Sequence, residues 1–451
     1  MNIDSSEINN SNGARAPVNV LSEQEKFRSF IFFFSGQFAS LFGSSIVMFA
    51  IIWWITDTTE SAIFLSLASF LSFVPVLILI PITGVYADRW NKKHIIIIAD
   101  FLQAVFTLGL IFLFSIGMAN IYAVLFLILL RGICQAFHQP AIMSIIPYMV
   151  PQKYLAKVNS VSTFLSGMLL IISPVIAATL MAFLSIGQVY WVDIITFVIA
   201  VIPSIFLKFS VKKRKRKRKR KSKFIKEFKE GMGALKEIEG LISLLVLFAV
   251  ESFFIAPFFI LSTYFVNVTH SGSAFDVALV QASFQVGIVI GAIIVFTRKR
   301  WNKKVLTMVR MILLQLGGML IILFSPFTAF LMIGGGRLIM GIGMALINSM
   351  VTTLIQTIIT PRKQGRAMSI IMVISNSVIP LSMILSGFMA ELFGIYLFFW
   401  ACFIGTIVAT VLGVFRTNIL SIDNLVEEKM NEKNTPKSDT EEQEEVFYDK
   451  N

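Results

Sequence analysis

Charged side chains are rare inside the long apolar stretches of this chain, and the few that occur there are the first candidates for chemistry. Glu251 is the one carboxylate well inside its stretch, and Asp100 lies two helical turns into another. Carboxylates buried among apolar helices recur in proton relays, because protonation removes the cost of burying their charge. The competing interpretation is a static ion pair. The pattern favours proton binding for Glu251 and a static pair for Asp100, and His138 is a further candidate for proton transfer.

Arg131 lies near the middle of an apolar stretch, where an unpaired charge costs about 2.5–3.5 kcal/mol on insertion scales. It is expected to face a bundle interior and to pair with a carboxylate. Asp100 is the candidate partner of Arg131, and the alternative is that Asp100 pairs with the cluster at residues 88–89. Gln135 and His138 follow Arg131 on the same helix face, and such a stripe typically borders a water-filled cavity; the alternative is a hydrogen bond between helices. Two aspartates near the outer ends of their stretches are predicted to be boundary residues: Asp57 and Asp193.

Further polar side chains recur at helical spacing in the first, eighth and tenth apolar stretches, where they are predicted to line a central cavity. The chain also contains 43 Phe and 20 Met. A cavity with many aromatic side chains and few fixed polar groups suits bulky amphipathic compounds better than a sugar or an ion. The cavity candidates in these stretches are Gln37, Gln281, Gln285, Asn348, Thr352 and Gln356.

The elements that position these residues are predicted from the apolar stretches. Hydrophobic residues make up 56% of the sequence and charged residues 14%, against about 25% charged in a soluble domain. A helix needs roughly 20 apolar residues to cross a bilayer, and the strands of a membrane barrel would alternate in polarity instead. Twelve membrane-spanning helices are predicted, at about 29–55, 61–87, 94–117, 120–145, 157–183, 189–208, 241–266, 274–297, 305–325, 328–358, 367–391 and 394–416.

Lysine and arginine predict the orientation of these helices. The loops after the second, fourth, eighth and tenth stretches are basic, whereas the alternate loops contain no Lys or Arg. Positively charged loops remain in the cytoplasm. We therefore expect a multi-pass protein of the cell membrane with both termini cytoplasmic. Residues 1–26 lack the pattern of a cleaved signal peptide and are predicted to be a cytoplasmic tail.

A repeat predicts two similar halves. The pentapeptide Arg-Trp-Asn-Lys-Lys occurs at residues 89–93 and again, 211 positions later, at residues 300–304. Arg131 and Arg337 are separated by a similar distance, 206 positions. The halves are predicted at 27–208 and 239–416, with six helices each. Because both begin and end on the same side, an axis along the membrane normal would relate them.

The connection and the tail carry opposite charges. Residues 209–238 form a basic linker that contains ten consecutive Lys or Arg at 212–221. Next to a membrane such a run favours anionic lipids over nucleic acid, and the apolar residues after it predict an amphipathic helix at the interface. Residues 417–451 contain ten Asp or Glu against four Lys and are predicted to be disordered.

The first copy of the pentapeptide belongs to a longer signature, Gly-Val-Tyr-Ala-Asp-Arg-Trp-Asn-Lys-Lys at residues 84–93. It resembles the loop between helices 2 and 3 of the major facilitator superfamily, which implies an all-α fold of twelve transmembrane helices in two six-helix halves. The resemblance suggests a latch that stabilises one access state through ionic contacts. The second copy has Val295 and Lys299 where the first has glycine and aspartate, so a latch would be asymmetric. Its predicted residues are Gly84, Asp88, Arg89, Lys92 and Lys93.

Within that superfamily, residues 84–89, 98–104 and 131–141 look similar to the macrolide-efflux-like drug:proton antiporters. The resemblance implies export of amphipathic drugs, macrolide-like antibiotics among them, in exchange for protons. One alternative is an exporter of a native metabolite or siderophore, and another is a membrane scaffold or sensor that acts through the basic linker. The sequence contains no phosphate-binding loop and no metal-ligand cluster. It therefore predicts no enzyme activity, cofactor or metal, and a monomer suffices for this architecture.

Overall fold

The computed structural model describes residues 23–206, 232–233, 235–298, 301 and 303–434. In this part of the chain, twelve helices are long and apolar enough to cross a membrane, as predicted. The first six spans are built from seven helices, because the short α6 continues directly into α7 as one span. They are α1 (Glu23–Thr59), α2 (Ala62–Arg89), α3 (Lys92–Ser115), α4 (Ile121–Met149), α5 (Gln152–Phe183), α6 (Ile186–Val189) and α7 (Trp191–Phe206).

The last six spans follow the linker. The eleventh span consists of two consecutive helices, and a one-turn helix and a π-helix follow the seventh. The elements are α9 (Leu241–Ile260), α10 (Ser262–Tyr264), η1 (Phe265–Thr269), α11 (Ala274–Thr297), α12 (Lys304–Leu323), α13 (Phe330–Ile358), α14 (Pro361–Ser377), α15 (Ile379–Phe393), α16 (Ile395–Arg416) and α17 (Ser421–Asn434).

Polar side chains cap the first turns of several helices. Asn91 accepts a hydrogen bond from Lys93 N at the start of α3, and Asn120 accepts one from Ala123 N at the start of α4. Ser273 and Asp276 form a capping box at the start of α11. These side chains satisfy backbone N–H groups that a helix leaves without partners in its first turn.

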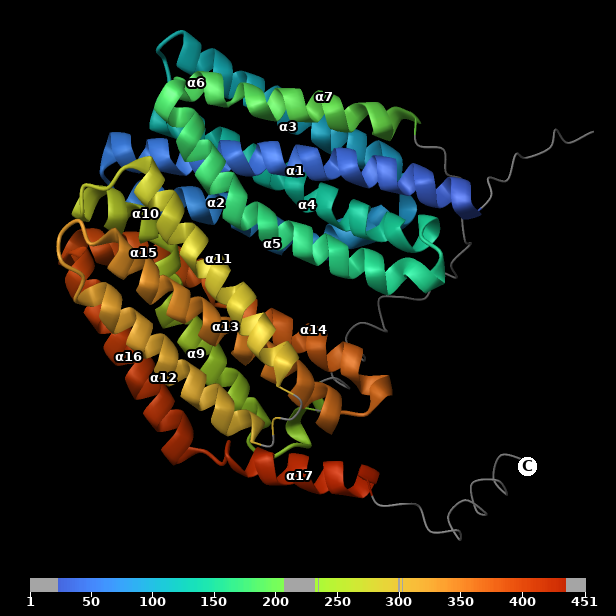
Figure 1. Cartoon of the computed structure of the whole chain (residues 1–451), viewed down its shortest axis with the longest axis vertical. Coiled ribbons are helices and arrows are strands. Elements are labelled where there is room, and N and C mark those ends of the chain that lie inside the picture. Colours follow the sequence, from blue (N-terminus) through green and yellow to red (C-terminus); the bar gives the residue numbers. More distant parts are fainter. Residues whose placement is uncertain (1–22, 207–231, 234, 299–300, 302, 435–451) are drawn as a thin grey trace, which may run out of the picture.

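The spans form two bundles, one from the blue and green helices and one from the yellow to red helices (Figure 1). The bundles meet where α2 packs against α15 and α5 packs against α11. The largest apolar cluster takes residues from both halves, for example Ile51 and Ile55 of α1 with Phe258 of α9 and Phe399 of α16. The two halves therefore share one core, which lies at the end of the bundles away from the basic loops.

At the other end each half has a core of its own. Phe33 of α1 and Ile145 of α4 belong to a cluster made only by the N-terminal half. Ile312 of α12 and Ile355 of α13 belong to a second cluster, made only by the C-terminal half. Both clusters lie beside the basic loops that contain the repeated pentapeptide. The halves are thus joined at the end away from the basic loops and are separately packed at the basic end.

The acidic tail is not disordered throughout, which corrects the prediction for residues 417–434. Ile419, Ile422 and Val426 are buried in the core of the C-terminal half. Ile422 and Val426 lie on one face of α17, and Ile419 lies just before this helix. The high average charge of the tail concealed this short apolar stripe. The Asp423 carboxylate accepts hydrogen bonds from Val305 N at 2.9 Å and Leu306 N at 3.0 Å, so it caps α12. Residues 435–451 lie outside the described residues.

Most of the basic linker predicted at 209–238 also lies outside the described residues, namely residues 209–231 and 234. At its end, Leu235 and Ile238 are buried in the core of the C-terminal half. This end of the predicted amphipathic helix therefore packs against protein. The binding of anionic lipids by residues 212–221 stays a prediction.

Replacing Asp423 with alanine tests whether α17 holds α12 in place. The change removes the acceptor of two backbone N–H groups, and we expect the free energy of unfolding to fall by about 1–2 kcal/mol. Glu428→Ala is the matched control, since it removes the same charge from an exposed position of the same helix. Denaturant unfolding in detergent micelles measures both. Equal effects of the two variants would show that the cap contributes nothing.

Candidate functional site

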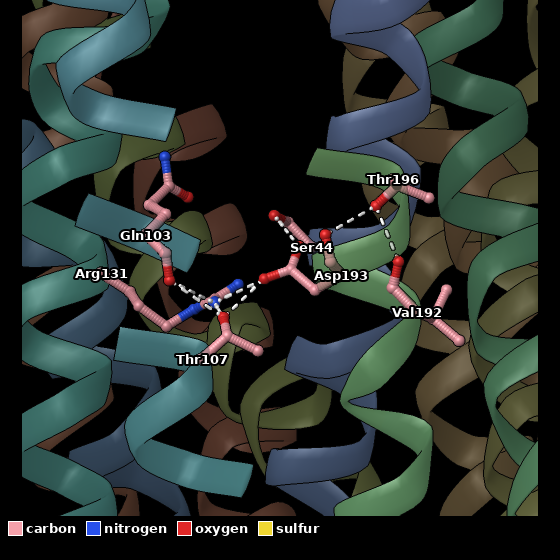
Figure 2. Close-up of polar contacts among 7 residues, drawn as sticks. All are labelled: Ser44, Gln103, Thr107, Arg131, Val192, Asp193 and Thr196. Carbon is pink, nitrogen blue, oxygen red and sulfur yellow. Dashed lines mark hydrogen bonds and ion pairs between the residues drawn. The ribbon is translucent and has the colours of Figure 1, made fainter. Parts of the chain in front are cut away.

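A buried ion pair joins two helices in the N-terminal half. Arg131 Nη1 on α4 lies 2.8 Å from Asp193 Oδ2 on α7, and both side chains are almost fully buried. Figure 2 shows the guanidinium of Arg131 directed at this carboxylate, with Thr107 of α3 between the two helices. The charge of Arg131 is therefore compensated inside the bundle, as the cost of burying it requires.

Neighbouring hydroxyl groups fix the carboxylate of Asp193. Ser44 Oγ on α1 donates to Asp193 Oδ1 at 2.8 Å, and Thr107 Oγ1 donates to Asp193 Oδ2 at 2.6 Å (Figure 2). Arg131 Nη1 also contacts Thr107 Oγ1. Four helices, α1, α3, α4 and α7, thus contribute to one layer of hydrogen bonds.

The prediction that Asp193 is a boundary residue was wrong. The sixth span begins at Ile186 rather than at 189, because α6 adds a turn before α7. Asp193 therefore lies two turns inside the span and reaches Arg131. Asp57, by contrast, is exposed and accepts a hydrogen bond from Asn267 Nδ2 at 3.2 Å.

Asp100 also has a different partner from the one predicted. Its Oδ1 lies 2.9 Å from His138 Nε2, so it pairs with neither Arg131 nor, in any described contact, residues 88–89. Gln37 bridges the pair: its Nε2 donates to Asp100 Oδ2 at 2.9 Å, and its Oε1 lies 2.8 Å from His138 Nε2. Because His138 Nε2 faces two oxygen acceptors, this nitrogen carries a hydrogen.

The Asp100 and Asp193 groups form two stacked layers. Ser44 follows Gln37 by seven residues, Thr107 follows Asp100 by seven and His138 follows Arg131 by seven. Seven residues are about two turns, or roughly 10 Å along a helix. Ser204 of α7 completes the second layer by accepting from Gln37 Nε2 at 3.1 Å. The same four helices therefore hold two polar layers, of which the second contains two protonatable side chains.

In the C-terminal half, Glu251 on α9 is buried, with 5% of its surface exposed. Its polar neighbour is Gln315 of α12, one of whose terminal amide atoms lies 2.6 Å from Glu251 Oε1. Among the described residues no Lys, Arg or His forms an ion pair with this carboxylate. Sequence reasoning missed Gln315, because it is a single glutamine in an apolar helix and belongs to no polar row.

Arg337 on α13 is the counterpart of Arg131 by repeat spacing, but its surroundings differ. Its Nη1 donates to the Phe258 carbonyl oxygen at 2.8 Å, and the guanidinium lies over the rings of Phe259 and Phe284 at 4.6 and 5.2 Å. Its Nε is buried without a hydrogen-bond partner in the described residues. A carbonyl and two rings thus stand where the N-terminal half has a carboxylate.

The remaining cavity candidates are spread over three helices and join neither polar layer. Gln135 and Gln285 are half-buried, Gln281 Nε2 donates to Thr263 Oγ1 at 3.2 Å, and Thr352 Oγ1 donates to the Asn348 carbonyl oxygen at 2.9 Å. Asn348 and Gln356 are exposed in the structure, which contains no membrane. Their role in a substrate cavity stays a prediction.

The structure describes the side chains of only some residues of the predicted latch. Gly84, Asp88 and Arg89 lie in the last turns of α2, and their side chains fall outside the described residues. Lys92 Nζ donates to the Ser144 carbonyl oxygen at 2.9 Å, and Lys93 Nζ donates to the Ile205 carbonyl oxygen at 2.5 Å. These two contacts tie the start of α3 to α4 and α7 of the same half. A latch between the halves stays a prediction.

Removing one partner of the Arg131–Asp193 pair should be strongly destabilising. Asp193→Leu leaves the arginine charge buried and uncompensated, so we expect a loss of about 3–5 kcal/mol in the free energy of unfolding. The double variant Arg131→Met with Asp193→Leu should recover most of that loss, because neither charge remains. Asp57→Leu serves as the exposed control. Additive effects of the two single changes in denaturant unfolding would argue against the pair.

Comparisons with known proteins agree with this architecture. Macrolide efflux protein A of Streptococcus pyogenes is 28% identical over 377 residues, which cover 84% of this chain and 92% of that protein. A staphyloferrin A transporter of Staphylococcus aureus is 27% identical over 188 residues, covering 40% of this chain and 46% of its own length. The first similarity extends over both halves.

The fold is also that of solved transporters. A bacterial homologue of the iron transporter ferroportin, solved in an inward-facing state, superposes with a TM-score of 0.67 at 12% identity and covers 86% of this chain and 98% of its own. The family model of the major facilitator superfamily matches residues 33–378 and, in a second match, residues 299–444. The chain therefore belongs to the major facilitator superfamily and is similar to the macrolide efflux proteins within it.

Proposed function

We propose that this transporter exports amphipathic small molecules, macrolide-like antibiotics among them, in exchange for protons by alternating access. The observation that carries the proposal is the arrangement of the cores. The halves share one core at one end and have separate cores at the other. Two rigid bundles packed together at one end can rock about a central site, and rocking exposes that site to one side at a time.

The orientation predicted from the basic loops puts the shared core on the outer side of the membrane. There, Glu391 of α15 caps α2 of the other half: its Oε2 accepts from Ile63 N at 3.1 Å and from Ser61 Oγ at 2.9 Å. A carboxylate at a helix N-terminus is favoured by the helix dipole. Gly387, one turn before Glu391, lets α15 approach the backbone of α2. The described state is then closed to the outside.

Proton coupling is supported by the protonatable groups in the two halves. Asp100 and His138 share one layer, and Glu251 is buried in the other half beside an amide. At a membrane potential of 100 mV each proton that enters releases about 2.3 kcal/mol, which supports a substrate gradient of about fifty-fold. One proton for each substrate would therefore drive useful export.

Two observations support the proposed substrate class. The similarity to macrolide efflux protein A covers both halves, and the abundance of Phe and Met suits large amphipathic compounds. The second candidate is a siderophore or native metabolite, because a staphyloferrin A transporter matches two-fifths of the chain. A susceptibility panel of macrolides, dyes and siderophores, with and without the protein, separates the two.

Neutralising Glu251 tests the coupling. In everted vesicles, Glu251→Gln is expected to reduce proton-gradient-driven accumulation of a macrolide at least tenfold, since the side chain can no longer gain or lose a proton. Glu428→Gln, at an exposed position of α17, should leave accumulation unchanged. Normal accumulation by the Glu251 variant would contradict the proposed role. If deletion of residues 212–221 stopped activity while all buried carboxylates were dispensable, the scaffold function would be favoured instead.

A side chain at Gly387 should disturb the closed end. A Cβ there would lie 2.8 Å from both Ala62 O and Ile63 Cα of α2, so Gly387→Val is expected to shift the population away from the described state. Gly317→Val is the matched control, because nothing lies within 4 Å of a Cβ at Gly317. Distances between spin labels at the outer ends of α2 and α15 report the change. An unchanged distance distribution in Gly387→Val would exclude this contact as part of the gate.

A further inference from the structure

Gln315 occupies a position between three helices of the C-terminal half. It is fully buried on α12 and lies against Gly343 of α13, where a Cβ would come within 2.6 Å of Gln315 Cγ. One terminal atom of its amide lies 2.6 Å from Glu251 Oε1 on α9. The other lies 3.2 Å from Met344 N and 3.4 Å from Met340 O, both in the backbone of α13. A single amide therefore connects the carboxylate to a neighbouring helix.

The two orientations of this amide match the two protonation states of Glu251. With the nitrogen towards an ionised carboxylate, Gln315 donates to Glu251 and its oxygen accepts from Met344 N. With the oxygen towards a protonated carboxyl group, Gln315 accepts from Glu251 and its nitrogen donates to Met340 O. An ionised carboxylate can only accept, and a protonated one can donate. Loss of the proton therefore requires the amide to turn over.

The amide of Gln315 contacts both partners of one backbone hydrogen bond of α13, the Met344 N–H group and the Met340 carbonyl. In an α-helix the Met344 N–H group pairs with the Met340 carbonyl, and the amide of Gln315 reaches both groups. It competes for the carbonyl in one orientation and for the N–H group in the other. A side chain that enters the hydrogen-bond ladder of a helix can bend it there. A change in the protonation state of Glu251 would thus change how α13 is held, one to two turns after Arg337.

The other titratable groups on these elements form no described contact with Glu251. Arg337 on α13 and Cys402 on α16 are buried, but neither forms a described hydrogen bond or ion pair with Glu251. Further charged side chains face outward or stand near helix ends on the described parts of the surrounding elements. They include Lys304, Arg310, Lys363, Arg366, Glu391, Arg416, Asp276 of α11, and Asp423, Glu427 and Glu428 of α17. The described polar contact of the Glu251 carboxylate is therefore the one with Gln315.

We infer that Gln315 is a positioning residue that transmits the protonation state of Glu251 to α13 by reversing its side-chain amide. This inference rests on the proposed proton-coupled function, and it adds the structural step between proton binding and helix movement. Glu251 gains or loses one proton, the amide of Gln315 exchanges its hydrogen bond with Met344 N for one with Met340 O or the reverse, and no covalent bond other than the O–H bond of Glu251 is formed or broken.

The test compares pH profiles of macrolide transport by purified protein in liposomes. Gln315→Met keeps the length and approximate volume of the side chain and removes the amide. The ionised carboxylate then loses a charge-assisted hydrogen bond, whereas the protonated form loses a weaker neutral one. We expect the midpoint of the pH–rate profile to move to higher pH by about one unit or more, equivalent to a tenfold change in proton affinity. Gln152→Met, at an exposed position, should leave the midpoint unchanged.

Infrared difference spectra between high and low pH give a second measurement that does not require transport. The carbonyl band of the protonated Glu251, identified by its loss in Glu251→Gln, should shift in Gln315→Met because its hydrogen bond to the amide is gone. If Glu251→Gln keeps the wild-type pH profile, the proposed proton function fails. If Glu251→Gln abolishes the pH dependence while Gln315→Met changes neither the midpoint nor the band, only the role of Gln315 fails.

Discussion

Arg131 carries a full positive charge in the middle of an apolar helix, and the N-terminal half is arranged around the need to compensate it. The carboxylate of Asp193 does so at 2.8 Å, and hydroxyl groups from two further helices hold that carboxylate. Because lipid offers no alternative partners, this layer fixes how α1, α3, α4 and α7 pack. The second layer, around Asp100 and His138, follows two turns away on the same helices.

The C-terminal half also has six spans, but it does not repeat the ion pair that compensates the buried arginine. Arg337 has the repeat position of Arg131, yet a backbone carbonyl and two aromatic rings replace the carboxylate. The buried carboxylate of this half, Glu251, stands beside an amide rather than a cation. An ion pair favours one charge state of its members, whereas an amide can serve either state of a carboxyl group. The Arg131–Asp193 layer therefore favours one fixed arrangement of charges, whereas the surroundings of Glu251 fit the change of charge that we propose for it.

The spans could be predicted from the sequence because an apolar run of about 20 residues has one stable outcome in a bilayer. The partners of the buried charges were harder to predict, because they depend on how deep each residue lies in the membrane and on how each helix is rotated about its axis. An error of three residues at the start of the sixth span moved Asp193 from a pairing position to the boundary. Asp100 was recognised as a paired carboxylate, but its partner is His138. Gln315 belongs to no row of polar residues that the sequence would reveal. The apolar stripe of α17 was missed because the average charge of the tail is strongly negative.

A transporter must couple a local change of charge to a movement of two large bundles, and the packing suggests how a small free energy suffices. The bundles already have complete separate cores beside the basic loops. In the alternating access that we propose, movement there would uncover little additional apolar surface, whereas the shared core at the other end would have to open. That shared end is held in part by polar contacts, in which Glu391 caps a helix of the opposite half. Such contacts are individually worth only about 1 kcal/mol, which is less than the roughly 2.3 kcal/mol that one proton would release at 100 mV in the exchange that we propose.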